Sequence, residues 1–220
     1  MAKKTFYGWY VLLGLCLIYA ASNGIVTLSL KRFYPSLIDV FSWTRAEVTR
    51  PVSVFYFALA FLTPIIGALL DRRNPKRIML IGSFIILIGL ALMGQIQNLS
   101  QFIGIYIILA IGLAGAGLIS SMYILTKWFH KHRGKAVGIL LVGGSLGGAL
   151  FNKITGDAID IMGWRNAALL LAGLGALFMI LPWIFLVRNK PQDMGLFPDG
   201  ADSEPEINLV EGVSLAEAFK

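Results

Sequence analysis

The stretch GALLDRRNPKRIML (residues 67–80) places five charged side chains between two long apolar runs. The charged residues are Asp71, Arg72, Arg73, Lys76 and Arg77. Pro75 resists the continuation of a helix through this segment, because it lacks a backbone N–H and its ring clashes with the preceding turn. The pattern therefore predicts two apolar helices that are joined by a short, charged reversal of the chain.

The composition of the whole chain indicates a membrane protein. Of 220 residues, 57% are hydrophobic and only 14% are charged, and the mean hydropathy is +0.74. A soluble domain typically has about 25% charged residues. The net charge is +7, but in a membrane chain an excess of Lys and Arg is more typical of cytoplasmic loops than of nucleic-acid binding. We therefore expect a lipid bilayer and no nucleic acid as a partner.

The apolar runs predict an all-α fold that crosses the membrane repeatedly. A bilayer core of about 30 Å needs about 20 apolar residues in a helix. The first run is longer than the apolar core of a secretory signal, so we predict that it is a true span. The resulting prediction is a six-helix transmembrane bundle within residues 1–187, with spans near 8–30, 51–70, 78–97, 102–126, 136–159 and 166–187.

The positions of the basic residues predict the orientation of these spans. Dense basic clusters occur at 3–4, 72–77, 127–135 and 188–190, and all of them fall on one side of the predicted membrane. Cations on the other side are scattered, namely Lys31, Arg32, Arg45, Arg50 and Arg165. Because cytoplasmic loops carry the excess of Lys and Arg, we expect a multi-pass protein of the plasma (inner) membrane with both termini in the cytoplasm.

The charged reversal resembles the loop between helices 2 and 3 of the major facilitator superfamily. The residues that match the pattern of this family are Gly67, Asp71, Arg72, Lys76 and Arg77. Asn74 stands where the family usually has Gly, and Asn tolerates the left-handed backbone that we expect at this point.

In that family the Asp and the first Arg of the motif latch helix 2 against the far half of the molecule in the outward-open state. The resemblance implies the same role for Asp71 and Arg72. The alternative is a simple topology signal in which Asp71 forms a local salt bridge. That alternative gives no reason for Gly67 one helical turn earlier.

A second segment narrows the resemblance to one branch. The stretch WFHKHRGKAVGILLVGGSLGG (residues 128–148) is similar to the start of helix 5 in monocarboxylate transporters and bacterial oxalate/formate antiporters. The stretches GWYVLLG (8–14), GWRNA (163–167) and KPQDMGLFPDG (190–200) agree with the same branch. The run near 143–148 also resembles an antiporter motif, although Gly144 stands where that motif often has Pro.

The resemblance implies that the chain is the N-terminal half of a twelve-helix transporter. Such a protein carries small organic anions, here mono- or dicarboxylates, by alternating access and by exchange or proton coupling. It needs no cofactor, and its partner is a second six-helix half in the same gene or in a partner chain. Residues 188–220, which are rich in Pro, Gly and acidic residues, are then a cytoplasmic linker, and SLAEAFK (214–220) has the pattern of a starting amphipathic helix.

Polar residues within the predicted spans are the candidates for a substrate cavity. Tyr19 and Asn23 fall near the middle of the first span, and Ser120 and Tyr123 fall in the fourth. A buried Asn is costly unless its amide finds partners. A water-filled cavity and a hydrogen bond to a neighbouring helix both meet that need, and the sequence leaves the two open.

Two lysines near the outer side, Lys153 and Lys31, are further candidates for substrate binding. Lys153 and Asp157 stand four residues apart in the fifth span, so they share a helix face. A cation that faces a cavity attracts a carboxylate, whereas a self-neutralised pair near the surface does not. Lys31, at the outer end of the first span, is either a functional cation or an interfacial one.

Glycines in the fourth and fifth spans predict close helix packing rather than chemistry. Small residues at about four-residue spacing let helix backbones approach each other. The positions that we assign to packing are Gly112, Gly115, Gly143 and Gly147.

Other classes of protein fit the sequence poorly. An intramembrane enzyme needs metal ligands or a nucleophile with a base, and the two histidines, His130 and His132, stand in a basic loop without nearby acids. We therefore predict neither catalytic residues nor a metal site. A transport-incompetent half, either truncated or dependent on a partner half, remains the alternative to a transporter.

Overall fold

The computed structural model describes residues 6–200, and these residues form helices and connecting turns without a β-strand. Most of the linker and the stretch 214–220 lie outside the described residues, as do Lys3 and Lys4. The elements in chain order are α1 (Gly8–Asn23), the π-helix η1 (Gly24–Ser29), the 3-10 helix η2 (Leu30–Phe33), α2 (Tyr34–Phe41), α3 (Arg45–Arg72), α4 (Pro75–Met93), α5 (Leu99–Ala116), α6 (Leu118–Trp128), α7 (Arg133–Phe185), and the 3-10 helices η3 (Pro191–Met194) and η4 (Pro198–Gly200).

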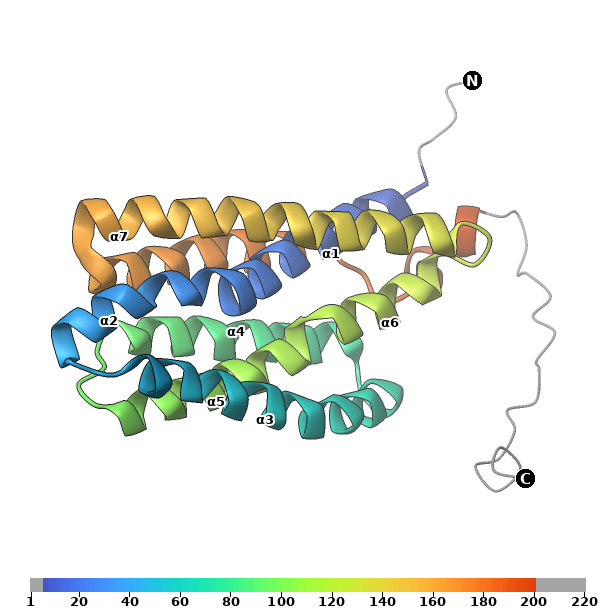
Figure 1. Ribbon diagram of the computed structural model, residues 1–220. Helices are drawn as coiled ribbons and strands as arrows, with labels where there is room; N and C mark the ends of the chain where they lie inside the picture. The colour runs from blue at the N-terminus through green and yellow to red at the C-terminus, as the bar shows by residue number, and fades with distance from the viewer. Residues whose placement is uncertain (1–5, 201–220) are drawn as a thin grey trace.

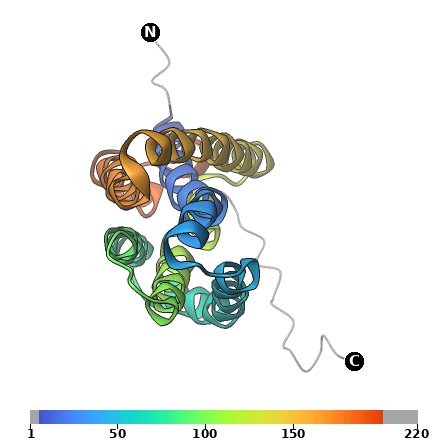
Figure 2. The same ribbon diagram turned by 60° about the vertical axis from the view of Figure 1, so that its left-hand side comes forward.

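Five helical stretches within the described residues are long and apolar enough to cross a membrane. Their bounds are Gly8–Phe41, Arg45–Arg72, Pro75–Met93, Leu99–Trp128 and Arg133–Phe185. The long helices run alongside one another: α1 packs mainly against α7, α5 packs against α3 and α4, and α4 also contacts α7 (Figures 1 and 2). The all-α architecture predicted from the apolar runs is therefore confirmed.

Helix α7, an element of 53 residues, contains the predicted span 136–159 and all but the last two residues of the predicted span 166–187. Within this element Gly163 alone departs from helical geometry, with φ 78° and ψ 160°. Glycine adopts a positive φ without steric cost, since it has no Cβ. The chain turns back on itself in this element, so that its two limbs run side by side (Figure 1).

Helices α3 and α4 begin earlier than hydropathy predicts, because polar residues cap them. Thr44 and Glu47 form a capping box at the start of α3, six residues before the predicted start at Pro51. The side chain of Asn74 accepts a hydrogen bond from the amide of Arg77 at 3.3 Å. Asn74 is extended, with φ −67° and ψ 112°, so the expectation of a left-handed residue there is wrong, and this Asn acts as a helix cap instead.

The predicted fourth span, 102–126, is interrupted. Helix α5 ends at Ala116 and α6 begins at Leu118, with Gly117 between them at φ −88° and ψ −148°. A Cβ at position 117 would lie 2.5 Å from the carbonyl oxygen of Leu113. The break therefore requires glycine.

Glycines also mark the closest approaches between helices. A Cβ at Gly147 would lie 2.3 Å from the Cβ of Ala20, and one at Gly143 would lie 3.1 Å from the Cβ of Cys16. In the other group of helices, a Cβ at Gly112 would lie 2.9 Å from the carbonyl oxygen of Gly82. Gly115 also lies close to α4, since a Cβ there would lie 3.2 Å from the Cα of Gly82. These contacts bring α1 against α7 and α4 against α5.

Candidate functional site

A cavity of about 380 Å³ lies among α1, α3 and the break between α5 and α6. It is the best candidate for a functional site, because it combines apolar walls with a few polar groups, as small-molecule sites do. Its lining residues are Tyr19, Asn23, Thr27, Leu28, Lys31, Tyr56, Leu59, Thr63, Leu113, Ala114, Leu118 and Ile119.

One wall of the cavity is a line of four polar residues. They come from α1, η1 and η2 and stand four residues apart, namely Tyr19, Asn23, Thr27 and Lys31. The sequence predicted the first two as cavity residues and left Lys31 open between a functional and an interfacial role. Thr27 was missed, although the four-residue spacing was a signal that could have found it.

The opposite wall belongs to α3, which sequence reasoning did not consider. Tyr56 and Thr63 stand seven residues apart, close to two helical turns, and so face the same side. The hydroxyl of Thr63 donates to the carbonyl oxygen of Leu59 at 2.8 Å, which satisfies its donor and leaves its lone pairs free. Two polar residues at this spacing in an apolar run were the available signal.

Asn23 finds its partner within its own helix and also lines the cavity. The hydroxyl of Thr27 donates to the backbone oxygen of Asn23 and contacts its side-chain Oδ1 at 3.1 Å. The residue that bonds to a neighbouring helix is instead Ser22, whose hydroxyl donates to the carbonyl oxygen of Ala116 at 3.3 Å.

The hollows next to the cavity carry a net positive charge. Lys31 also lines two further hollows on the same side of the bundle. Arg50 lines the first of them, and Arg45 and Asp39 line the second. Three cations against one acid make this approach favourable for an anion.

The remaining predicted cavity residues are not brought to this cavity. Ser120 is fully buried, and its hydroxyl has no hydrogen-bond partner among the described residues. Tyr123 is half-buried, and its ring lies 4.4 Å from the Nζ of Lys127. The side chain of Lys153 is 76% exposed and pairs with Asp157 at 3.2 Å, because this face of α7 points away from the cavity.

In the charged reversal between α3 and α4, Lys76 is held by contacts with the bundle, whereas Asp71, Arg72 and Arg77 form an open part that is exposed. Lys76 is fixed, since its carbonyl oxygen accepts from the indole of Trp183 at 2.7 Å and its Nζ lies 4.4 Å from that ring. Asp71, Arg72 and Arg77 are exposed. Among the described residues Asp71 has no ion-pair partner within 4.0 Å, and a Cβ at Gly67 would meet nothing within 4 Å.

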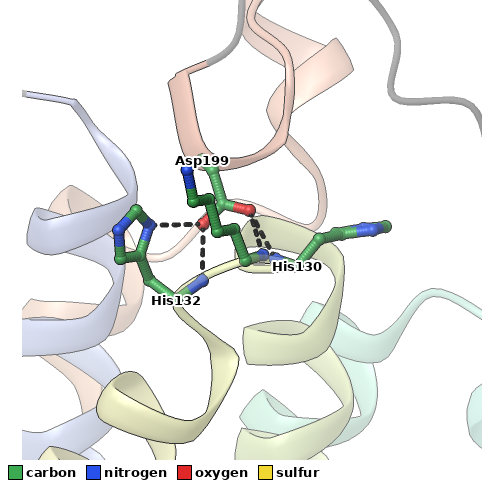
Figure 3. A network of polar contacts seen from close by, with 4 residues as sticks. His130, His132 and Asp199 are labelled. Atoms are coloured by element: carbon green, nitrogen blue, oxygen red, sulfur yellow. Dashed lines mark hydrogen bonds and ion pairs between the residues drawn. The ribbon is translucent and has the colours of Figure 1, made fainter.

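The beginning of the predicted linker is folded and docked onto the bundle. The carboxylate of Asp199 accepts hydrogen bonds from the backbone amides of His130 at 2.7 Å, Lys131 at 2.6 Å and His132 at 3.2 Å. It also contacts the Nδ1 atom of His132 at 3.2 Å (Figure 3). Burial alone would raise the pKa of Asp199, but the hydrogen bonds outweigh it and hold this pKa below its usual value. The sequence analysis did not predict this contact. In the described part of the chain, no cluster of metal-ligating side chains occurs.

The sequence and the fold were compared with known proteins. The family model of the Major Facilitator Superfamily matches residues 6–215. The fold aligns with a TM-score of 0.77 and 23% identity to the inward-facing, unoccupied crystal structure of a bacterial homologue of the human lysosomal transporter Spinster, over 99% of this chain and 49% of that one.

Curated relatives match with similar identity. A probable L-galactonate transporter of Escherichia coli is 29% identical over 67% of this chain and 32% of its own length. A probable hexose phosphate transport protein of Chlamydia pneumoniae is 29% identical over 83% of this chain and 40% of its own length. The sialic acid transporter NanX of Escherichia coli is 28% identical over 64% of this chain and 32% of its own length. The chain thus spans less than half the length of these relatives.

Proposed function

Because this chain belongs to the major facilitator superfamily, we propose that it is the N-terminal six-helix half of a secondary transporter for small organic anions. Family membership makes it part of a multi-pass membrane transporter and not an enzyme. Transport by alternating access, with exchange or proton coupling, is the mechanism that we propose for the whole protein.

The length of α7 supports six spans rather than five. At 1.5 Å per residue, a helix of 53 residues would be about 80 Å long, more than twice the bilayer core of about 30 Å. The break at Gly163 divides it into 133–162 and 164–185, and each part is long enough to cross once. With the four other apolar stretches, the half then has six spans. An even number of spans brings both ends of the half to the same side, which we propose is the cytoplasm, in the inner membrane.

The cavity supports an anionic substrate, and Lys31 is the observation that carries this proposal. Of the residues that line the cavity, Lys31 alone is a Lys, Arg, Asp or Glu. Tyr19, Asn23 and Thr27 offer hydroxyl and amide donors on the same wall. The named substrates of the relatives, galactonate, hexose phosphate and sialic acid, all carry a carboxylate or phosphate group. We propose a substrate of this class, with mono- and dicarboxylates of the oxalate, formate or monocarboxylate type included.

The decisive experiment is uptake by the complete protein in proteoliposomes, with a panel of sugar acids, hexose phosphates, monocarboxylates and dicarboxylates. Neutral sugars of matched size serve as the comparison. We expect Lys31→Ala to reduce anion uptake about 10- to 100-fold, because a hydrogen bond to a charged group contributes about 1.5–3 kcal/mol. Lys31→Arg retains part of the activity.

Lys153→Ala is the matched variant, because Lys153 is a cation on the outer side that points away from the cavity. We expect this variant to transport normally. Equal uptake of neutral and anionic compounds, or full activity of Lys31→Ala, would contradict the proposal. Failure of every compound to be taken up by a correctly inserted protein would favour a transport-incompetent half.

A further inference from the structure

The four polar residues on the cavity wall are spaced four residues apart, and in a regular α-helix residues at this spacing do not stay on one narrow face. An α-helix has 3.6 residues per turn, so each step of four residues overshoots a full turn by about 40°. Three such steps, from Tyr19 to Lys31, would rotate the side chain by about 120°. All four residues nevertheless line the same cavity.

The π-helix η1 accounts for this alignment. It spans Gly24–Ser29, between Asn23 and Lys31, and its i→i+5 hydrogen bonds take more residues into each turn than an α-helix does. The wider turn offsets the overshoot. Without it, Lys31 would rotate away from the wall that Tyr19 and Asn23 define.

Side chains within this segment hold the π-turn only in part. The hydroxyl of Ser29 is fully buried and donates to the carbonyl oxygen of Gly24, five residues earlier, at 2.9 Å. The hydroxyl of Thr27 donates to the carbonyl oxygen of Asn23. Both bonds stay inside the first span and do not fix how that span is rotated against its neighbour.

Asn152 of α7 supplies the connection to the neighbouring helix. Its Nδ2 atom donates to the carbonyl oxygen of Leu28, within the π-turn, at 3.0 Å. Its Oδ1 atom accepts from the Nε atom of Arg32 at 2.9 Å. The two helices are in backbone contact nearby, since a Cβ at Gly24 would lie 2.9 Å from the carbonyl oxygen of Gly147. The side-chain amide of Asn152 thus forms hydrogen bonds to the chain both before and after Lys31.

We propose that the π-turn is the element that sets charge selectivity, and that Asn152 is the positioning residue that holds Lys31 toward the cavity. This inference rests on the proposed function of Lys31. It assigns a role to the residue next to Lys153, which was the candidate cation on this helix. Asn152 itself does not line the cavity.

The test is a double-mutant cycle in the complete transporter. We expect Asn152→Ala to raise KM for an anionic substrate about tenfold, with the maximal rate changed by less than about twofold. In a Lys31→Ala background the same change should have no further effect, because coupled residues are not additive. Asn166→Ala is the control on the same helix, since its amide donates only to Met162 of its own helix, at 3.0 Å.

A second measurement does not depend on transport. A cysteine at position 31, in a Cys16→Ala background, is labelled with an anionic, membrane-impermeant thiol reagent. We expect Asn152→Ala, and also the milder Arg32→Ala, to slow this labelling several-fold, and Asn166→Ala to leave it unchanged. Unchanged labelling in both variants, or additive effects in the cycle, would overturn the inference. If labelling slows but Lys31→Ala transports normally, Asn152 holds the turn and it is the proposed function that fails.

Discussion

Tyr19 occupies its place on the cavity wall because the facing residue of α7 is a glycine. A Cβ built at Gly144 would lie 2.2 Å from the Cε1 atom and 2.7 Å from the Cδ1 atom of the Tyr19 ring. The ring therefore lies directly on the backbone of α7. No other side chain leaves room for it there.

We predict that Gly144→Ala displaces the Tyr19 ring and costs about 1–3 kcal/mol, which is typical of overpacking in a filled interior. Thermal unfolding of the detergent-solubilised protein measures this loss. Tyr19→Ala should relieve it in the double variant. Gly138→Ala is the control, because a Cβ there would meet nothing within 4 Å and Ala is the better helix former. Equal stability of the two alanine variants would contradict the prediction.

The candidate site could be read from the sequence only where position along a span was sufficient. Tyr19 and Asn23 were predicted because they are polar residues near the middle of the first span. Thr27 was missed although it continues the four-residue spacing of Tyr19 and Asn23. A regular helix would rotate residues at that spacing progressively away from one wall, and the π-turn that offsets this rotation is not visible in the sequence. Lys153 was a candidate as a cation inside a span, with a self-neutralised pair with Asp157 as the alternative, and the packing of α7 leaves it exposed and paired with Asp157.

At the scale of whole elements, the segment after α7 is part of the bundle rather than a free linker. The indole of Trp128, at the end of α6, donates to the carbonyl oxygen of Arg188 at 3.0 Å. The amide of Lys76, in the first turn of α4, donates to the side chain of Asn189 at 3.0 Å. Asp199 then binds the amides at the turn between α6 and α7. The helix ends on this side are thereby tied together, and the connection to any following half begins beyond residue 199.

We predict that Asp199→Asn weakens this contact, because the hydrogen bonds from the amides of residues 130–132 lose their charged acceptor. Asn also tolerates the positive φ of 56° at this position, so the backbone is preserved. Hydrogen exchange of residues 130–132 and 188–199 should become several-fold faster. Asp193→Asn, in the same segment but exposed, is the control.

The contact should depend on pH in a defined direction. Because folding lowers the pKa of Asp199 from its ordinary value of 3.8, the stabilisation is complete above that value and is lost as the pH falls through the lower, folded pKa. The Asp199 carboxylate therefore predicts no change between about pH 5 and 8 in the protection of these amides, which is their exchange rate relative to that of an unfolded chain at the same pH. Unchanged exchange in Asp199→Asn would show that other contacts hold the segment.

Helix existence followed from hydropathy, whereas helix ends and breaks did not. The apolar runs are long, and each of them is helical in the structure, although the six predicted spans fall in five helical stretches of the described residues. The ends depend on single polar residues such as Thr44 and Asn74, which cap helices ahead of the apolar run. The break at Gly163 falls in the gap between the predicted spans 136–159 and 166–187. The break at Gly117 was not predicted, because it lies inside the continuous apolar run 102–126, where other glycines stay helical.

At the scale of the whole molecule, α3 is the least covered of the long helices. In its most apolar stretch of 18 residues only 6% of the residues are buried, against 67% in the corresponding stretch of the first span. Phe57 is 68% exposed and Phe61 is 61% exposed. The chain also spans less than half the length of its relatives. These observations support the proposal that α3 faces a second six-helix half as well as lipid.

The open part of the charged reversal lies at one end of this uncovered helix. Asp71 is exposed and Gly67 has no neighbour within 4 Å of a built Cβ, so both are available to a partner surface. A topology signal would give Asp71 a local salt bridge. Within the described residues Asp71 interacts with the hydroxyl of Tyr123 but forms no ion pair, and the ion pairs there involve Asp157 and Asp199. This contrast favours the latch over the topology signal.

We predict that Asp71→Asn weakens the outward-open state and lowers anion uptake by the complete transporter about tenfold, the effect of a shift of about 1.4 kcal/mol between the two states. Labelling of a cysteine at position 56, on the cavity wall of α3, should become slower from outside and faster from the cytoplasmic side. Asp160→Asn, an exposed acid on α7, should change neither measurement. Within this half Asp71 interacts with the hydroxyl of Tyr123, and the amide oxygen of Asn can accept the same hydrogen bond, so the amount of inserted protein should stay constant. Normal uptake together with unchanged labelling would leave Asp71 as a topology signal and exclude the latch.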